Sequence, residues 1–239
     1  MFRKRRFNVL IIELSKNSYV SLQYFQYLGN PNIGLFIIAT DEFLLVPSGM
    51  SENKVEFLKR CFKVDKALSL RIRGSKLLGA LSAANSNGVV LPFGCEHEAE
   101  LIRERLGVKA ASIQTFISLG NRTLANDKAA IVDPQMPEEV IRVIEEVLNV
   151  KVKRSTIANL PYVGSSAVAS NRAVYAHPKI RQDETLLIED FLDVPVHTGT
   201  VMNGIPYVKL GLIVNQKGGV VGRGTSGSEL MAISRCFSL

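Results

Sequence analysis

Cysteine and histidine are the residue types in this chain that could carry covalent chemistry. A cysteine nucleophile needs a base within hydrogen-bonding reach. The 239-residue sequence offers three of each: Cys61, Cys95 and Cys236, and His97, His177 and His197. Cys61 and Cys236 each directly precede a phenylalanine of an apolar helical pattern. This matching placement favours packing, since free cysteine often behaves as a small buried hydrophobe. A nucleophilic Cys236 is kept as the alternative.

Sequence motifs for metals, phosphates and cofactors are missing. There is no CxxC pair, no HExxH and no GxGxxG after a strand, and the glycine-rich segment 218–227 lacks the GK[ST] of a phosphate-binding loop. We therefore expect neither a metal nor a cofactor. The odd number of widely spaced cysteines is typical of a reducing compartment, which predicts a cytoplasmic protein.

The positive charge of the chain is concentrated at its N-terminus. Of the net charge of +7, residues 1–29 carry +4, largely from Arg3-Lys4-Arg5-Arg6, and the remaining 210 residues carry +3. The basic segment could contact phosphate or be a solvated chain end, and the sequence leaves both open. The rest of the chain has no aromatic-rich motif for RNA recognition, and no apolar run approaches the roughly 18–20 residues of a membrane span.

The elements that must position any functional residue recur with a period near 44 residues. A short apolar strand ends at Pro47, Pro92, Pro134, Pro178 and Gly222, in steps of 45, 42, 44 and 44. A polar turn such as Asn85–Gly88 precedes each strand, and an earlier strand precedes the turn, so each repeat begins with a β-hairpin. These earlier strands are expected at 34–39, 79–84, 123–125, 164–169 and 211–214.

Each hairpin is followed by a helix with one apolar stripe and then by a third strand. The stripes are Val55, Leu58 and Phe62; Ala99, Ile102 and Leu106; Val140, Ile144, Val147 and Leu148; Leu187 and Phe191; and Leu230, Ile233 and Phe237. The third strands are expected at 64–72, 108–116, 150–156 and 194–200. The chain ends before a fifth such strand, and the strand-like segment 20–28 stands one period before the strand expected at 64–72. We therefore predict that segment 20–28 completes the fifth repeat and closes a ring.

The predicted fold class is α+β, with five ββαβ units around a central axis and the helices outside. The repeats span about 30–72, 73–116, 117–156, 157–200 and 201–239. They form a single domain, 20–239, because no repeat can bury its helix stripe alone. The basic extension 1–19 is predicted to lie outside that domain.

With the repeats placed, a set of segments spread over the whole chain can be compared with known families: Leu28–Gly34, Ala39–Glu42 with Val46-Pro47, Asn85–Pro92, Leu119–Asn121 and Gly222–Leu230. In these segments the chain resembles the translation initiation factor 6 family, archaeal type. The resemblance implies the pentein fold, a five-fold pseudosymmetric ring. The extension 1–19 departs from the family's usual pattern, and the chain stops at the last helix, where eukaryotic forms have a regulatory tail.

The resemblance implies a monomeric binding protein and not an enzyme. Such factors attach to the large ribosomal subunit near the sarcin-ricin loop, contact the protein uL14 and prevent premature joining of the small subunit. They also take part in late maturation of the large subunit. A rim contact to ribosomal RNA is possible in this reading. The competing reading is that of other pentein proteins, which are guanidine-modifying enzymes with a cysteine nucleophile.

The loops that precede the first strand of each repeat are equivalent by symmetry and should lie on one face. Leu119-Gly120-Asn121 matches a family motif at the ribosome-facing surface, so Asn121 is the first candidate for binding. The further candidates from these loops are Asn30, Pro31, Asn32, Arg122 and Lys76. For the asparagines, local turn geometry is the competing explanation.

Overall fold

A hairpin, a long helix and a further strand recur in the computed structural model, which describes residues 22–239. The predicted extension 1–19 lies outside the described residues. The first four sheets are β2 Ile38–Ala39, β3 Phe43–Pro47 and β4 Lys66–Leu70; β5 Ala83–Asn85, β6 Gly88–Leu91 and β7 Lys109–Ser112; β8 Thr123–Ala125, β9 Ala129–Val132 and β10 Lys151–Arg154; and β11 Ala167–Ala169, β12 Val174–Ala176 and β13 Val196–Thr198. In each, the hairpin is antiparallel and the strand after the helix pairs in parallel with the second hairpin strand.

The fifth sheet takes its third strand from the beginning of the described chain. β14 Leu212–Val214 and β15 Gly219–Gly222 form the hairpin, and β1 Leu22–Phe25 pairs in parallel with β15. The register runs from Leu22 opposite Gly219 to Phe25 opposite Gly222. β1 thus fills the place that β4, β7, β10 and β13 fill in the other sheets, and it covers an edge of β15 that would otherwise be unpaired.

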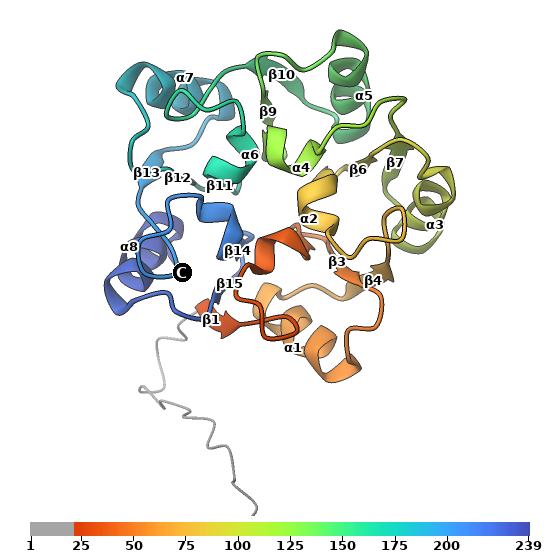
Figure 1. The fold of residues 1–239 in the computed structure, drawn as a ribbon, viewed down its shortest axis with the longest axis horizontal. Helices are drawn as coiled ribbons and strands as arrows, with labels where there is room; N and C mark the ends of the chain where they lie inside the picture. Colours follow the sequence, from red (N-terminus) through yellow and green to blue (C-terminus); the bar gives the residue numbers. More distant parts are fainter. Residues whose placement is uncertain (1–21) are drawn as a thin grey trace, which may run out of the picture.

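Five helices of eleven residues lie outside the sheets within the described chain (Figure 1). They are α1 Glu52–Phe62, α3 Glu96–Leu106, α5 Glu138–Leu148, α7 Gln182–Leu192 and α8 Gly227–Phe237. The predicted stripes of α3 and α5 are buried, as are Leu58 and Phe62 of α1 and Ile233 and Phe237 of α8.

The predicted stripe of α7 packs against the core but lies at the border of the buried face. Its buried face consists of Glu184, Ile188 and Leu192, and Leu187 and Phe191 are half-buried at the border. The glutamate is buried because its carboxylate is hydrogen-bonded, which a hydropathy pattern does not register. In α8, Glu229 is likewise buried where the pattern favours its neighbour Leu230.

Four of the first hairpin strands begin later than predicted, because a short helix precedes them; the third, β8, occupies residues 123–125 as predicted. The short helices before the first hairpin strands are η1 Ile33–Leu35, α2 Leu78–Leu81, α4 Leu119–Arg122, α6 Val163–Ser166 and η2 Val208–Leu210. Residues 34–35, 79–81 and 164–166, which were predicted as extended, are therefore helical.

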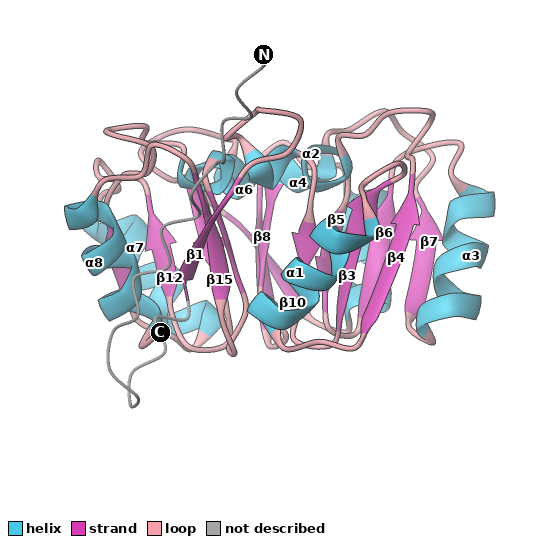
Figure 2. Cartoon of the chain, turned by 90° about the horizontal axis from the view of Figure 1, so that it is seen from below, coloured by secondary structure: helices cyan, strands magenta, loops and turns pink. Residues whose placement is uncertain are grey.

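The short helices contact one another in a closed cycle. η1 contacts α2, α2 contacts α4, α4 contacts α6, α6 contacts η2, and η2 contacts η1. Their close approach depends on glycine: a Cβ on Gly79 would lie 2.2 Å from the carbonyl oxygen of Gly34, and one on Gly120 would lie 2.0 Å from that of Gly79. The five sheets therefore surround a common axis, with all short helices at one end of the strands (Figure 2).

The hydrophobic core is divided into clusters that each join two neighbouring repeats. One cluster, for example, combines Val90 of the second repeat with Ile144 and Leu148 of α5 in the third. Another combines Phe25 and Val220 of the fifth sheet with Leu44 of the first. Each long helix thus packs between two sheets, so neighbouring repeats share their cores.

Candidate functional site

The end of the ring that carries the short helices holds all the loops with candidate binding residues. We call it the short-helix face: it comprises η1, α2, α4, α6, η2, the loops before them and the turns that follow the second and third strands of each sheet. The hairpin turns lie at the opposite end (Figure 2).

Four loops of this face contain a tight turn in the left-handed backbone region. Their central residues are Leu28-Gly29, Arg73-Gly74, Ala158-Asn159 and Met202-Asn203, all with positive φ. Backbone pairs such as Tyr27 with Asn30 close the turns. Such a conformation is uncommon for leucine, and Leu28, at φ 51°, is also 72% exposed. Backbone strain at an exposed apolar side chain points to a role in contacting another molecule.

Two buried carboxylates hold two of these turns in place. Glu229 accepts hydrogen bonds from the N–H groups of Asn203 and Gly204 and from the hydroxyl of Thr200. Glu184 accepts the equivalent bonds from Ala158, Asn159 and Thr156. Burial disfavours the charged form of Glu229, but these bonds and that from the Ser226 N–H outweigh it and lower its pKa to about 2.

The loop before η1 contains three of the predicted residues. The Asn30 side-chain oxygen accepts from both the N–H and the side-chain amide of Asn32, each at 2.9 Å. The carbonyl of Pro31 accepts from the Ile33 N–H. All three residues are half-buried. The two asparagines therefore shape the loop.

Asn121 and Arg122 lie in α4 but differ in how strongly the chain engages them. The Asn121 amide donates to the Ser118 hydroxyl at 2.9 Å, which donates to the Ala80 carbonyl. Within the described chain the Asn121 side-chain oxygen has no other partner. The Arg122 guanidinium pairs with Asp133 at 2.5 Å, and Asp133 is buried. The charge of Arg122 is thus largely compensated inside the chain.

The remaining predicted residue, Lys76, lies beside the first of these loops. Its ammonium nitrogen is 5.8 Å from the centre of the Tyr27 ring, and the residue is half-buried. The six predicted residues therefore share one face. Their role in binding stays a prediction.

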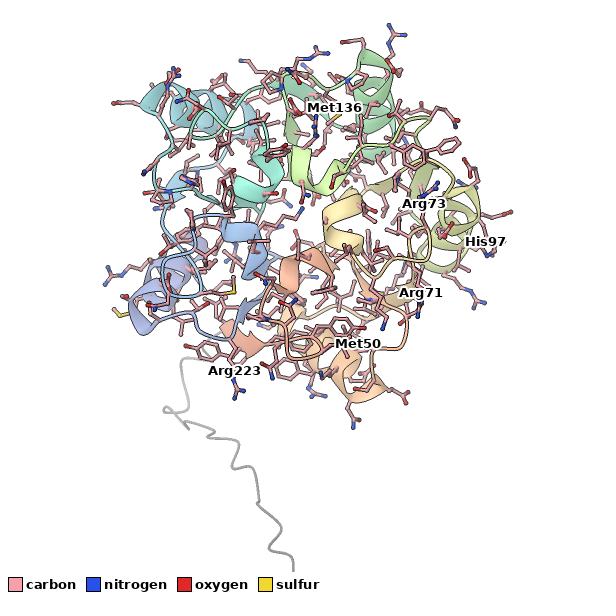
Figure 3. The ribbon with its side chains drawn as sticks, in the orientation of Figure 1. Met50, Arg71, Arg73, His97, Met136 and Arg223 are labelled. Carbon is pink, nitrogen blue, oxygen red and sulfur yellow. The ribbon has the colours of Figure 1, made fainter. Side chains whose placement is uncertain are left out.

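The sequence reasoning missed an exposed arginine–phenylalanine cluster on the same face. The Arg73 guanidinium lies 4.5 Å from the ring centre of Phe116 and donates to the Phe93 carbonyl at 2.7 Å. The two rings meet edge to face at 5.3 Å. Arg73 lies on the side of the ring near α3 (Figure 3). The sequence pattern predicted Phe116 inside a strand at 108–116, but this strand, β7, ends at Ser112. The local sequence signal for the cluster was Phe93, an aromatic residue between Pro92 and Gly94 in a turn.

Exposed apolar side chains gather on this face. Of the ten large hydrophobic residues exposed in the described chain, seven belong to it: Leu28, Leu77, Phe93, Phe116, Tyr162, Ile205 and Tyr207. Single exposed apolar residues are ordinary, but a group on one face is typical of an interaction surface.

The thiols do not have the properties of nucleophiles. Burial raises the pKa of Cys61 and Cys95 to about 11 and that of Cys236 to about 12, whereas a reactive cysteine has a lowered pKa. The Cys236 sulfur lies 3.6 Å from the Val174 carbonyl. The ring of His177 accepts from the Lys179 N–H through Nδ1, so it serves as a cap at the strand end. The packing interpretation of Cys236 is favoured over the catalytic one.

The described residues offer no obvious metal site or membrane span. No group of three or more His, Cys, Asp and Glu side chains in residues 22–239 could hold a metal ion. None of the helices in that range is both long and apolar enough to cross a membrane.

Comparison with known proteins agrees with the family resemblance. The model of the eIF-6 family matches residues 22–236. Translation initiation factor 6 of Aeropyrum pernix is 38% identical over 224 residues, which cover 92% of this chain and 96% of that protein. The factor of Nitrosopumilus maritimus is 42% identical over 87% of this chain and 94% of its own length. That of Pyrococcus furiosus is 39% identical with the same coverage. The chain therefore belongs to the eIF-6 family, whose members act as translation initiation factors.

Proposed function

We propose that this protein binds the large ribosomal subunit through its short-helix face and sterically prevents the small subunit from joining. The observation that carries the proposal is the group of seven exposed apolar side chains on this face, with Arg73 and Lys76 among them. Large apolar and arginine side chains are the residues that dominate protein interfaces.

The proposed partner at the centre of the interface is the ribosomal protein uL14, near the sarcin-ricin loop. Asn121 is placed to exchange hydrogen bonds with main-chain groups, because its side-chain oxygen has no partner within residues 22–239 and Ser118 fixes its amide. Asn30, Pro31 and Asn32 would form a second contact, with Lys76 and Arg122 at its edge. A role in late maturation of the large subunit belongs to the same proposal.

An anti-association factor needs a rigid body more than a reactive site. The closed cycle of contacts among the short helices supports the assignment of the pentein fold and a stiff ring. We expect the protein to act as a monomer in the cytoplasm, since both ribosomal subunits and the reducing conditions favoured by its unpaired thiols are found there.

The test is co-sedimentation with purified archaeal large subunits, with and without small subunits. Wild type should migrate with large subunits, be absent from joined particles and lower the joined fraction. Asn121→Ala should weaken binding by about tenfold, which corresponds to roughly 1.4 kcal/mol. Leu28→Asp should weaken it at least as much, because it places a charge in the apolar contact.

The matched control is Arg172→Ala, an exposed residue in a hairpin turn at the opposite end of the ring. This variant should bind like wild type. If Arg172→Ala abolishes binding and the two variants of the short-helix face do not, the wrong face has been assigned. If the wild type stays unbound over a range of salt concentrations, the ribosomal function itself is refuted.

A further inference from the structure

The exposed arginine–phenylalanine cluster of the short-helix face is assembled from three separate loops. Arg73 lies between β4 and α2, Phe93 follows β6, and Phe116 lies between β7 and α4. The sequence has no local aromatic motif here, and the fold brings the centres of the two rings within 5.3 Å of each other. We call these three residues, together with Arg71, the rim cluster.

The guanidinium of Arg73 is held in one position by its neighbours. Nη1 donates to the Phe93 carbonyl at 2.7 Å, and the guanidinium carbon lies 4.5 Å from the centre of the Phe116 ring. Gly94 leaves room for it, since a Cβ there would lie 2.6 Å from Nη1. A guanidinium has five N–H donors in a rigid plane, and the carbonyl takes one of them. Because Arg73 is exposed, the other donors are open to an outside partner.

The positive charge of the rim cluster is not neutralised by an ion pair in the described part of the chain. Neither Arg71 nor Arg73 forms one there, and Arg71 donates to the Gly74 carbonyl at 3.3 Å. Both arginines lie on the same side of the ring (Figure 3). The neighbouring carboxylates, Glu96 and Glu98, are in the first turn of α3, where they favour the helix dipole. They lower the local net charge, which favours contact with one phosphate over a long stretch of backbone.

The ring of Phe116 has an open face. Arg73 lies over one face of the ring, and Phe93 meets it edge to face, yet Phe116 is 71% exposed. An exposure this large leaves the face opposite Arg73 accessible. An accessible aromatic face is a stacking surface for another planar group.

A second arginine–aromatic pair on the same face differs in its charge. The Arg122 guanidinium lies 5.6 Å from the centre of the Tyr162 ring, and Tyr162 is exposed. However, Arg122 is paired with the buried Asp133, which compensates its charge. The rim cluster instead combines exposed rings with arginines that have no such partner in the described chain. Tyr162 therefore supplies a matched control.

We propose that the rim cluster binds an unpaired nucleotide of RNA, with the base stacked on the open face of Phe116 and the phosphate held by Arg73 and Arg71. A nucleotide presents a flat aromatic face beside a negative charge, so it matches both features of the cluster. An acidic peptide would use the arginines alone, and an apolar segment would use the rings alone. The choice of RNA over DNA rests on the proposed function, under which the nucleotide belongs to the large ribosomal subunit.

The first experiment is a titration of the isotope-labelled full chain with adenosine monophosphate, followed by nuclear magnetic resonance. The backbone amide signals of Arg73, Phe93 and Phe116 should shift saturably. Adenosine, which lacks the phosphate, and ribose 5-phosphate, which lacks the base, should each bind more weakly at the same signals. Because the signals belong to the cluster, nucleotide bound elsewhere on the chain does not enter the measurement.

Substitutions separate stacking on the base from attraction to the phosphate. Phe116→Ala should weaken binding of adenosine monophosphate by about tenfold, the effect of losing one base–aromatic stack, and should leave ribose 5-phosphate unaffected. Phe116→Tyr keeps the ring and should retain binding. Arg71→Ala should weaken both phosphate-bearing probes by a similar factor. The control Tyr162→Ala should bind all three probes like wild type.

Three results would overturn the proposal. In the first, adenosine monophosphate causes no saturable shift at the cluster. In the second, Phe116→Ala weakens ribose 5-phosphate as much as adenosine monophosphate, so the base does not stack on the ring. In the third, a glutamate-rich peptide binds at the same signals more tightly than the nucleotide, which would assign the cluster to an acidic protein partner.

Chemical probing of unpaired bases on large subunits tests the link to the ribosome. Bound wild type should protect a base of the ribosomal RNA, and Phe116→Ala, added until the subunits are saturated, should leave that base reactive. If wild type co-sediments with large subunits and no base is protected in this way, the RNA assignment is wrong and the proposed function stands. If the nucleotide binds as expected and wild type does not bind large subunits, the proposed function fails and the nucleotide site stands.

Discussion

At the scale of single residues, the two buried glutamates explain how the short-helix face keeps its shape. Glu184 and Glu229 occupy the third position of α7 and α8, where each accepts the backbone N–H of the residue that caps its own helix, Arg181 and Ser226 respectively. The same carboxylates bind the left-handed turns at Ala158-Asn159 and Asn203-Gly204. One side chain thus couples a helix to a loop of the proposed interface.

Glu229→Gln should destabilise the fold by roughly 2–3 kcal/mol at neutral pH, because it removes the charge that these donors stabilise. The folded pKa of about 2 is below the unfolded value of 4.5, so this contribution is complete above about pH 4.5 and is lost as the pH falls toward 2. Urea unfolding of wild type and variant at pH 7, 4 and 3 measures it.

The control for this prediction is Glu104→Gln, an exposed glutamate on α3. It should change stability little at any of these pH values. A constant difference between wild type and Glu229→Gln from pH 7 to pH 3 would contradict the assignment, since it would mean that the loss does not come from the charge.

At the scale of elements, β1 contributes more to the packing of the hydrophobic core than its four residues suggest. Leu22 and Phe25 are both buried, and they belong to two different hydrophobic clusters. β1 therefore joins the fifth sheet to the cores on either side of it.

A truncation that begins at Val20 keeps β1, and one that begins at Gly29 removes it. The first should melt close to wild type. The second should lose roughly 5 kcal/mol or more, because two large apolar side chains are deleted and the edge of β15 is exposed. Differential scanning calorimetry of both compares them directly; equal melting temperatures would mean that β1 does not close the ring.

The glycine contacts between the short helices give a second prediction at this scale. Gly120→Ala would place a Cβ 2.0 Å from the Gly79 carbonyl oxygen and 2.7 Å from that of Ser82, so α2 and α4 would have to separate. We expect a loss of roughly 3 kcal/mol or more. Gly227→Ala, at the open first position of α8, should be neutral or slightly stabilising. Chemical denaturation of both variants checks this contrast.

At the scale of the whole molecule, we expect the shared cores to make the ring one cooperative unit. Each of the hydrophobic clusters joins neighbouring repeats, from the first and second through to the fifth and first. A linear repeat array can unfold from its ends, but a closed cycle of such interfaces has no terminal repeat.

We therefore expect a single unfolding transition for the full chain. Far-ultraviolet circular dichroism reports the long helices, and tyrosine fluorescence reports the buried Tyr27 and Tyr175, which lie in different clusters. The two denaturation curves should coincide. Separated midpoints would show that part of the ring unfolds independently, in conflict with the shared-core description.

The sequence by itself determined the repeat, its hairpins and long helices, and the family. Turn residues such as Asn85 and Asn126 and the helix stripes are local signals with a constant period, so they predict hairpins and helices without knowledge of what packs on them. Counting alone also placed the strand-like segment 20–28 one period before the third strand of the first repeat. The extension 1–19 lies outside the residues that the structure describes.

The tertiary structure alone decided the features that depend on contact between repeats. Residues 79–81 form a helix and not a strand, and Gly79 packs there against the backbone of η1. Glu184 is buried because donors far along the chain, from 156 to 159, surround it. Phe93 and Phe116 meet edge to face although they follow different strands. Such effects arise between residues distant in sequence, and no local pattern records them.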